Sequence, residues 1–223
     1  MIPFSPTGGE YKPMNAFEAA VSPYYAPQQW RRIQQTRIGI AGAGGLGSNL
    51  AVALVRSGFK HLEIVDFDVI EARNLNRQFY FLEEIGRFKV EVLAERLRAI
   101  NPAVEIVAHQ TRLTPSNIAC HFESAQCLCE AFDRPEAKQM FLEAFLASKK
   151  FLVMGSGMAG ISNRTAISIR KLKENLHLVG DGVTPVSPKN PPCAPRVSAC
   201  AGLMASVVLE HVCQEADAEN RLQ

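Results

Sequence analysis

The sequence lacks an excess of charge of either sign. Its 223 residues carry a net charge of +2, so neither a basic field for nucleic acid nor an acidic tail is indicated. The N-terminus lacks a basic stretch followed by an apolar core, and no apolar run looks long enough to span a bilayer. We therefore expect no signal peptide, no nucleic-acid partner and no membrane partner.

The sequence also lacks C-x-x-C pairs, although it has six cysteines: Cys120, Cys127, Cys129, Cys193, Cys200 and Cys213. Structural zinc sites commonly use such pairs, so we expect no bound zinc. Cys127 and Cys129 lie in an apolar run that reads as a strand, which favours core packing over a ligand pair. Reduced thiols and a cytoplasmic location are the default for such a chain.

The remaining composition is that of a globular chain, with 47% hydrophobic and 21% charged residues. Predicted strands alternate along the chain with predicted helices. The strands are expected at 37–41, 61–67, 104–108, 126–132 and 151–155. The helices are expected at 27–35, 49–57, 85–100, 115–122 and 135–148. This alternation predicts an α/β fold, a Rossmann-like doubly wound and mainly parallel sheet.

After Gly157 the pattern changes. Residues 164–170 and 176–180 read as strands of an antiparallel C-terminal extension, and residues 197–213 read as a closing helix. We expect a single domain over residues 1–223, with an irregular N-terminal segment at 1–26.

A glycine-rich turn, "GAGGLG", follows the first predicted strand. Gly42 permits a tight turn, Gly44 and Gly45 let phosphate approach backbone N–H groups, and Gly47 lets the helix pack close to the strand. Asp66 follows about 20 residues after the turn, where a ribose-binding acid is expected. This pattern indicates a nucleotide site but does not separate NAD from ATP.

The stretch "VDFDVIEARNLNRQFY" favours ATP, because a polar loop follows the acid where a redox domain usually has a helix. Asn74 can hydrogen-bond a ribose or phosphate oxygen, and Arg77 offers a planar fork suited to phosphate. Lys89 lies near the start of the next helix and can reach the same pocket. Two cations beside a phosphate turn suit neutralisation of polyphosphate charge during transfer.

Asp133 is predicted at the end of the fourth strand, in "CEAFDRPEAKQ". Carboxyl ends of strands in such sheets face the ligand crevice. Asp133 is therefore a candidate Mg²⁺ ligand, since Mg²⁺ is typically held by one or two carboxylates plus phosphates. The alternative is that it caps the helix beginning near Pro135.

The segments "GAGGLGS", "DFDVIEARNLNRQ", "IGRFKVE" and "FDRPEAK", in this order and spacing, resemble the ThiF/MoeB/HesA family of ubiquitin-activating-enzyme-like adenylyltransferases. The ending "GDGVTP…APRVSACAGLMASVVLE" is similar to the compact second type of ThiF, the ThiS adenylyltransferases of thiamine biosynthesis. The resemblance places the family's ATP and Mg²⁺ positions at Gly44, Asp66, Asn74, Arg77, Lys89 and Asp133.

The resemblance implies a reaction in which the C-terminal carboxylate of a ThiS-like, ubiquitin-fold sulfur carrier attacks the α-phosphate of ATP. An acyl-adenylate and pyrophosphate result, and a homodimer is expected. The absence of histidine from these motifs agrees with this chemistry. An α-carboxyl titrates near about 3.5, so the nucleophile is already ionised and needs no general base.

One departure from the family pattern concerns the N-terminus, where many members carry an arginine that reaches the partner subunit's ATP. Residues 11–26 contain none, and Arg31 and Arg32 are the nearest. The missing arginine is the best support for one alternative, a non-catalytic adaptor that docks a carrier protein. A nicotinamide oxidoreductase also stays open, because its glycine turn would look alike.

Two cysteines near the C-terminal end receive opposite predictions. Cys193 lies in "PPCAPR", three residues before Arg196, whose charge would favour thiolate, so we expect an exposed and reactive thiol. Cys200 lies in an apolar helical run and is expected in the core.

Overall fold

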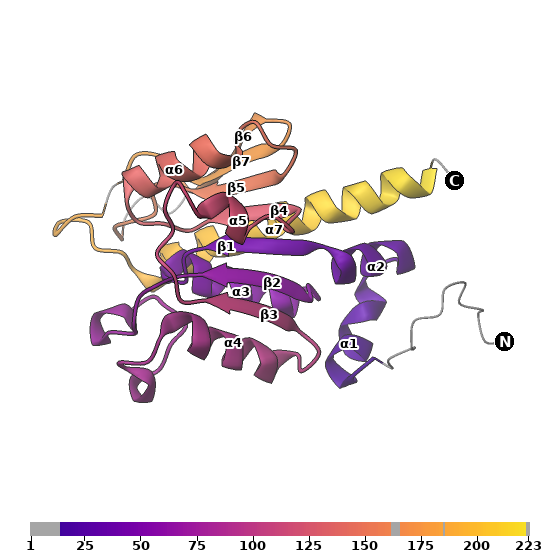
Figure 1. The fold of residues 1–223 in the computed structure, drawn as a ribbon, viewed down its shortest axis with the longest axis horizontal. Helices are drawn as coiled ribbons and strands as arrows, with labels where there is room; N and C mark the ends of the chain where they lie inside the picture. Colours follow the sequence, from indigo (N-terminus) through magenta and orange to yellow (C-terminus); the bar gives the residue numbers. More distant parts are fainter. Residues whose placement is uncertain (1–13, 162–165, 185, 222–223) are drawn as a thin grey trace.

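A seven-stranded sheet forms the centre of the computed structural model, which describes residues 14–161, 166–184 and 186–221. The strand order is β3-β2-β1-β4-β5-β7-β6 (Figure 1). The strands are β1 (Arg37–Ala41), β2 (His61–Val65), β3 (Glu105–His109), β4 (Cys127–Glu130), β5 (Phe151–Gly155), β6 (Ser168–Lys173) and β7 (Leu176–Gly180). Only the β6–β7 pair is antiparallel. The predicted α/β, Rossmann-like sheet with an antiparallel C-terminal extension is therefore confirmed.

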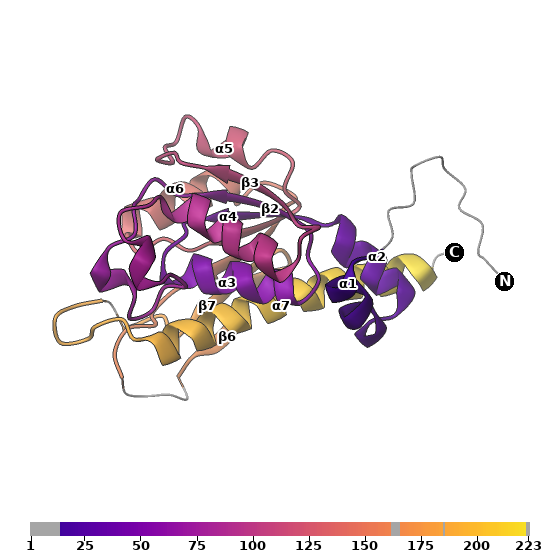
Figure 2. The same cartoon turned by 90° about the horizontal axis from the view of Figure 1, so that it is seen from below.

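Helices cover both faces of the sheet (Figure 2). The α-helices are α1 (Ala16–Val21), α2 (Pro27–Gln35), α3 (Gly45–Arg56), α4 (Lys89–Ile100), α5 (Ile118–His121), α6 (Pro135–Phe145) and α7 (Ala194–Arg221). Short 3-10 helices are η1 (Ser22–Tyr24), η2 (Ala72–Asn74) and η3 (Leu82–Glu84). Helices α3, α4 and α7 pack on one face, and α5 and α6 pack on the other.

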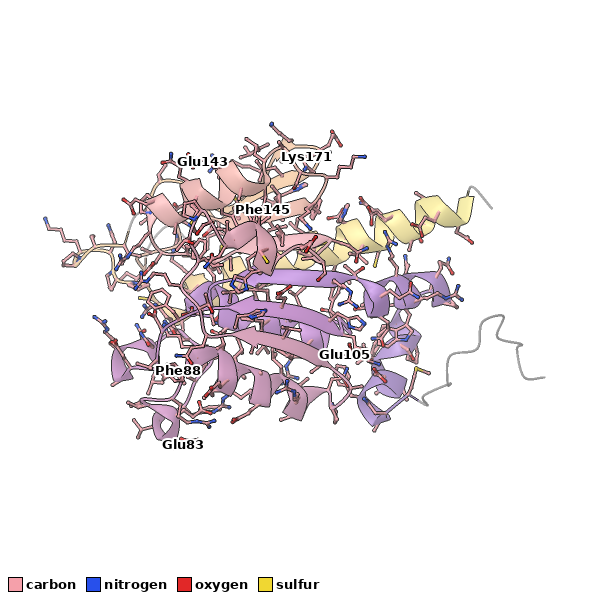
Figure 3. All side chains as sticks on the ribbon, in the orientation of Figure 1. Glu83, Phe88, Glu105, Glu143, Phe145 and Lys171 are labelled. Atoms are coloured by element: carbon pink, nitrogen blue, oxygen red, sulfur yellow. The ribbon has the colours of Figure 1, made fainter. Side chains whose placement is uncertain are left out.

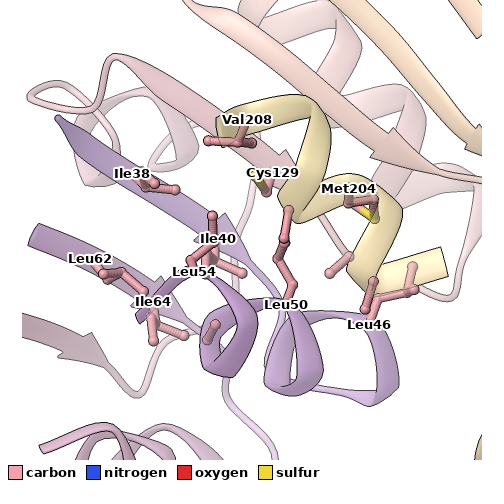
Figure 4. Packing of buried hydrophobic residues seen from close by; sticks show 14 of the residues in the cluster. Ile38, Ile40, Leu46, Leu50, Leu54, Leu62, Ile64, Cys129, Met204 and Val208 are labelled. Atoms are coloured by element: carbon pink, nitrogen blue, oxygen red, sulfur yellow. The ribbon is translucent and has the colours of Figure 1, made fainter. Parts of the chain in front are cut away.

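Each face has its own hydrophobic core. On the first face, Leu46 and Leu50 of α3 lie against Met204 of α7 and the strands behind them (Figure 4). On the second face, Phe145 of α6 stacks edge-on with Phe141, with ring centroids 5.2 Å apart. Figure 3 shows Phe145 toward the sheet and Glu143 on the outer side of the same helix. Burial of these rings holds α6 in place beneath the candidate site.

Cys127 and Cys129 are 2% and 0% exposed within this packed sheet. Burial raises the pKa of Cys127 to about 12 and that of Cys129 well above its ordinary value. The prediction that these two thiols belong to the core is confirmed.

Two helices begin at residues other than those predicted. The helix expected from residue 49 begins at Gly45, because the end of the glycine turn itself forms its first turn. The helix expected from residue 85 begins at Lys89. Gly86 has a φ of +89°, and Phe88 has extended backbone angles and bridges to Val69, so the chain before Lys89 is not α-helical.

The prediction of an irregular N-terminal segment at 1–26 is wrong for its second half, since α1 and η1 lie within it. Asn15 caps α1 by accepting a hydrogen bond from the Glu18 N–H, while the Glu18 carboxylate accepts one from the Asn15 N–H. Asn15 also donates to Asn101 over 2.7 Å, which ties α1 to the end of α4. Residues 1–13 and 162–165 lie outside the described residues. The first two positions of the predicted strand 164–170 are among them, and the observed strand β6 is Ser168–Lys173.

We expected no apolar run long enough to span a bilayer, and this expectation is wrong for one helix of the described residues. Residues Ala194–Asn220 of α7 are long and apolar enough, judged by length and composition only. Helices packed in the core of a protein have the same length and composition. In the structure, Met204 and Val208 are fully buried against α3 and the sheet. We assign the apolar character of α7 to this packing.

Candidate nucleotide-binding site

The glycine turn lies at the carboxyl end of β1, where the chain passes into α3. Gly42 has a φ of +104°, a conformation that favours glycine, and its N–H bonds the Val65 carbonyl at the end of β2. A Cβ on Gly47 would lie 1.8 Å from the Gly42 carbonyl oxygen. The predicted roles of Gly42 in the tight turn and Gly47 in close helix packing therefore match the geometry.

Gly44 and Gly45 lie at the start of α3, with Gly44 as the N-cap, and no side chain caps it. A Cβ on Gly44 would have a single neighbour within 4 Å, Gln78 Nε2 at 3.8 Å. A Cβ on Gly45 would lie 3.4 Å from Arg77 Cγ. Space above Gly44 and uncapped N–H groups suit an anionic phosphate.

Asp66 follows β2 directly and faces the glycine turn. Its carboxylate accepts hydrogen bonds from the Ala43 N–H over 2.6 Å and the Asp68 N–H over 2.8 Å. Burial raises the pKa of Asp66, and the charge of Lys89 and these two hydrogen bonds oppose the rise. The predicted ribose-binding acid is thus fixed to the turn by backbone hydrogen bonds.

Lys89 lies on the same side of the turn as Asp66. Its side chain is buried, and Nζ lies 2.9 Å from Asp68 Oδ2. Asp68 is a partner that the sequence analysis did not identify, although it lies two residues beyond the predicted acid. The Tyr80 hydroxyl, 4% exposed, donates to the Ala43 carbonyl and the Lys89 carbonyl and joins the turn to α4.

Arg77 is half-buried and lies beside Gly45 at the start of α3. It donates to the Asn76 side chain over 2.8 Å and to the Arg73 carbonyl over 3.1 Å. Partial burial lowers the pKa of Arg77, and the negative charge of Asp133 opposes this effect. Arg77 and Asp133 are therefore electrostatic neighbours, and both predicted cations lie near the turn, Arg77 beside Gly45 and Lys89 beside Asp66.

Asp133 was predicted at the end of the fourth strand, which is wrong by three residues, because β4 ends at Glu130. The capping alternative also fails, since the N-cap of α6 is Arg134, without a side-chain capping bond. Asp133 is exposed. Its carboxylate is therefore open to a ligand on the side where Arg77 lies.

Glu130, which the sequence analysis did not identify, is 0% exposed beneath Asp133. Its carboxylate accepts hydrogen bonds from Lys138 Nζ over 2.8 and 2.9 Å, and Lys138 also donates to the Gly155 carbonyl. Burial raises the pKa of Glu130, and Lys138 opposes the rise. This pair ties α6 to the ends of β4 and β5 and so fixes the approach to Asp133.

Two buried amides line the loop after β2. Asn74 Oδ1 accepts from the Glu71 N–H over 3.0 Å, so this oxygen stabilises the turn that begins η2. Gln78 Oε1 is buried and has no hydrogen-bond partner among the described residues. Because a buried polar atom ordinarily has a partner, Gln78 beside Gly44 fits a site that a polar ligand completes. The sequence analysis quoted the stretch containing Gln78 but gave this residue no individual role.

The carboxyl ends of β5 and β7 hold a second polar cluster. Asp181 accepts hydrogen bonds from the Val183 and Thr184 N–H groups and pairs with Arg196 at 2.7 Å. Arg196 is thus directed at Asp181, whereas the sequence analysis paired it with Cys193. Cys193 is partly exposed, and its reactivity stays a prediction.

Cys200 is 0% exposed, and burial raises its pKa to about 12. Its predicted place in the core is confirmed. The Sγ atom lies 3.4 Å from the Val179 carbonyl oxygen, so the thiol packs between α7 and β7.

Arg32 lies at the far end of the molecule. It pairs with Glu215 of α7 at 2.8 Å, and α2 leads into the amino end of β1, opposite the glycine turn (Figure 1). A hollow of about 430 Å³ lies at this amino end, lined in part by Arg32, Lys150 and His211. It contains none of the predicted site residues, so we place the nucleotide at the carboxyl ends instead, where open-sheet ligands bind.

Comparisons with known proteins agree with this geometry. The profile of the ThiF family matches residues 18–223. The adenylyltransferase and sulfurtransferase uba4 of Emericella nidulans is 30% identical over 196 residues, 84% of this chain and 39% of that protein. The tRNA threonylcarbamoyladenosine dehydratase of Haemophilus influenzae is 29% identical over 154 residues, 68% of this chain and 59% of that protein.

Among solved structures, the E. coli tRNA N6-threonylcarbamoyladenosine dehydratase in complex with ATP superimposes with a TM-score of 0.79. It is 23% identical, and the match covers 92% of this chain and 95% of that one. At 23% identity, this structural similarity establishes the fold alone.

Proposed function

The chain belongs to the ThiF family, and from this premise we propose that it adenylylates a carboxylate with ATP. The acceptor we propose is the C-terminal glycine carboxylate of a small ubiquitin-like carrier protein. The observation that carries the proposal is the pair of cations beside the glycine turn: Arg77 next to Gly45, and Lys89 paired with Asp68 at 2.9 Å. Hydride transfer releases no pyrophosphate, so it does not call for two cations that stabilise a departing phosphate group.

In the proposed reaction, a carboxylate oxygen of the carrier bonds to the α-phosphorus of ATP, and the bond to the bridging α–β oxygen breaks. Pyrophosphate leaves, and the carrier retains an acyl-adenylate. The glycine turn binds phosphate through backbone N–H groups, and Asp66 positions the ribose. Arg77 and Lys89 offset the repulsion between carboxylate and triphosphate and stabilise the charge on the departing pyrophosphate.

We propose Asp133 as the residue that holds Mg²⁺. Its exposed carboxylate beside Arg77 fits the hard oxygen donors that this ion prefers. Mg²⁺, when bound with ATP, neutralises phosphate charge. Glu130 is not a second ligand in this arrangement, because Lys138 occupies both of its carboxylate oxygens.

The finer assignment to a ThiS-like sulfur carrier, in thiamine biosynthesis, is also part of the proposal. It is supported by the similarity of the C-terminal segment to compact ThiF proteins. The chain spans 39% of the length of uba4, so the activities of that longer protein are not transferred as a whole. A homodimer and a cytoplasmic location likewise stay predictions.

A second candidate is a dehydratase acting on a threonylcarbamoyl-modified tRNA nucleoside. The 29% identity with the tRNA threonylcarbamoyladenosine dehydratase of Haemophilus influenzae supports this candidate. The threonyl group supplies a carboxylate that ATP could activate in the same way. The net charge of +2 opposes it, because binding to tRNA draws mainly on phosphate contacts with basic residues.

ATP–pyrophosphate exchange tests both candidates. The expected result is exchange that depends on a ThiS-like carrier ending in two glycines, and not on a carrier lacking its terminal glycine. Exchange stimulated by threonylcarbamoyl-modified tRNA would support the second candidate and contradict the first. A parallel NADH titration with saturable binding and no exchange would indicate the oxidoreductase class. Carrier binding without exchange would identify an adaptor.

A further inference from the structure

Two histidines and a glutamate converge on the face of the sheet that carries α5 and α6. They are Glu63 on β2, His109 at the end of β3, and His121 at the end of α5. One potential ligand atom from each lies within 4.8 Å of the other two. All three residues are partly buried, and none belongs to the nucleotide-site motifs.

The fold explains why these three side chains meet. In the parallel register, Glu63 lies opposite Val107 and Val65 lies opposite His109, so Glu63 and His109 are diagonal neighbours on one face. Helix α5 lies over this face, opposite α3 and α7 (Figure 2). Phe122, directly after His121, is 0% exposed in the second core and anchors the end of α5.

Contacts within the cluster hold the three potential metal ligands close together. His109 Nε2 lies 2.9 Å from Glu63 Oε1. The His109 and His121 rings meet edge-on, with centroids 4.6 Å apart. The described residues give the His121 ring no hydrogen-bond partner. A hydrogen-bonded pair accounts for Glu63 and His109, but it does not account for the position of the His121 ring against His109.

The donor atoms and charge of the cluster also suit a metal. Imidazole nitrogens coordinate metals in their neutral form, and His109 and His121 each offer one. Glu63 supplies one negative charge, which would partly neutralise a divalent ion.

We propose that Glu63, His109 and His121 form a binding site for a divalent transition metal of the zinc class, separate from the Mg²⁺ position at Asp133. Two imidazoles and one carboxylate are a ligand set of zinc sites that keep a fourth position open for water or substrate. The nitrogen donors disfavour Mg²⁺ and Ca²⁺, which prefer oxygen. This site revises the expectation of no zinc, which considered cysteine spacing alone.

The required rearrangement is small. Zinc–nitrogen and zinc–oxygen bonds of about 2.0–2.1 Å place tetrahedral ligand atoms roughly 3.3 Å apart. The potential ligand atoms lie within 4.8 Å of one another, so metal binding would draw them together by at most about 1.5 Å. The site is also linked to the nucleotide crevice, because the His109 carbonyl accepts a hydrogen bond from the Asp66 N–H over 3.1 Å.

The test is titration of the full chain with Co²⁺ and Zn²⁺ in the absence of ATP, so that its outcome does not depend on the proposed adenylylation. Equilibrium dialysis with metal analysis gives the stoichiometry, and the visible absorption of bound Co²⁺ reports the ligands and their geometry. We expect one ion per chain and a spectrum typical of low coordination number with nitrogen and oxygen donors. We expect His121→Ala and Glu63→Gln to weaken binding at least tenfold, with unchanged circular dichroism.

His61→Ala is the matched control. His61 and Glu105 form a similar pair between β2 and β3, with Nδ1 and Oε2 3.0 Å apart, but belong to no three-ligand group of the described residues. This variant should bind as the parent does. Equal binding by His121→Ala and the parent would overturn the proposal, as would absence of binding at micromolar metal. A thiolate charge-transfer band would overturn it too, by placing the ion on cysteine.

Discussion

Lys89 Nζ lies 2.9 Å from Asp68 Oδ2, and the same ammonium group opposes the rise in pKa that burial imposes on Asp66. The lysine is 5% exposed, so its charge is held in place before any nucleotide arrives. A preorganised cation stabilises a developing negative charge without reorganisation at the moment of reaction.

Lys89→Met should reduce exchange by about 10²–10³-fold, the cost of removing one charge-stabilising donor. Loss of the ammonium also removes the charge that opposes the raised pKa of Asp66, so this carboxyl should titrate at a higher pH than in the parent. Exchange kinetics and NMR titration of the Asp66 carboxyl provide the measurements.

Lys60→Met is the control for Lys89→Met. Lys60 Nζ lies 3.1 Å from Glu18 Oε1, in a similar pair away from the glycine turn. This variant should retain parental exchange. An equal loss of exchange in both variants would show that Lys89 acts only through stability.

Asp133→Asn should keep the fold but nearly abolish exchange, because an amide is a poor ligand for Mg²⁺ compared with a carboxylate. Asp133 is exposed and caps no helix, so its replacement should leave the melting temperature unchanged. Glu136→Gln, another exposed acid at the start of α6, is the matched control. Parental exchange with normal Mg²⁺ dependence in Asp133→Asn would remove this residue from the metal site.

Arg77→Ala should cost at least about 2 kcal/mol of transition-state stabilisation, or about 30-fold in kcat/KM. Arg73→Ala, on the same loop, is the control. Its side chain is 81% exposed, and the backbone carbonyl that Arg77 contacts is kept. A kcat/KM for Arg77→Ala equal to that of Arg73→Ala would exclude Arg77 from the mechanism.

Local sequence signals correctly predicted the bounds of several helices and strands. β1 and β5 have the predicted bounds, as do α2 and β7, because apolar periodicity and turn residues act within a few positions. The glycine turn could be predicted in the same way. The spacing of its glycines reflects the backbone conformation required at Gly42 and the close helix packing required at Gly47.

Contacts between distant elements could not be predicted in this way. No local signal pairs Glu130 with Lys138 across a strand end, or directs Arg196 to Asp181. The cluster of Glu63 with two histidines depends on the register of β2 and β3 and on how α5 crosses them. A search for short metal-binding motifs misses such a cluster, because its ligands come from three elements.

Asp181→Asn should destabilise the fold at neutral pH and have less effect in acid. Burial alone would raise the pKa of Asp181, but hydrogen bonds from Thr184 and Val183 and the charge of Arg196 hold it below its ordinary value. The folded state then binds the proton less tightly than the unfolded chain, whose pKa is about 3.9. The stability from Asp181 is therefore full above about pH 4 and is lost as the pH falls through the folded pKa.

We expect Asp181→Asn to lower the free energy of unfolding by roughly 2 kcal/mol at pH 7, the scale of hydrogen bonds to a charged group. Urea unfolding at pH 7 and near pH 3 measures the difference, which should shrink at the lower pH. Glu136→Gln is again the control and should change little at either pH. If the difference in unfolding free energy stays constant between pH 7 and pH 3, the ionisation of Asp181 does not contribute to stability.

The last prediction concerns Cys193, which lies directly before α7, and Cys200, which lies in the buried part of that helix. Cys193 is partly exposed, with Sγ 3.5 Å from the Pro191 carbonyl oxygen. Cys200 is 0% exposed, and burial raises its pKa to about 12, so little thiolate forms at neutral pH. We expect an alkylating reagent to label Cys193 before Cys200 in the native protein.

Peptide mapping after timed alkylation measures the two rates, with exposed Cys120 as an internal reference. Slower labelling of Cys193 than of Cys200 would reject a reactive thiol in this loop. We further expect Cys193→Ser to keep ATP–pyrophosphate exchange at the parental rate, because adenylylation uses a carboxylate nucleophile and needs no thiol. Loss of exchange in this variant, with folding intact, would instead place Cys193 within the adenylylation step.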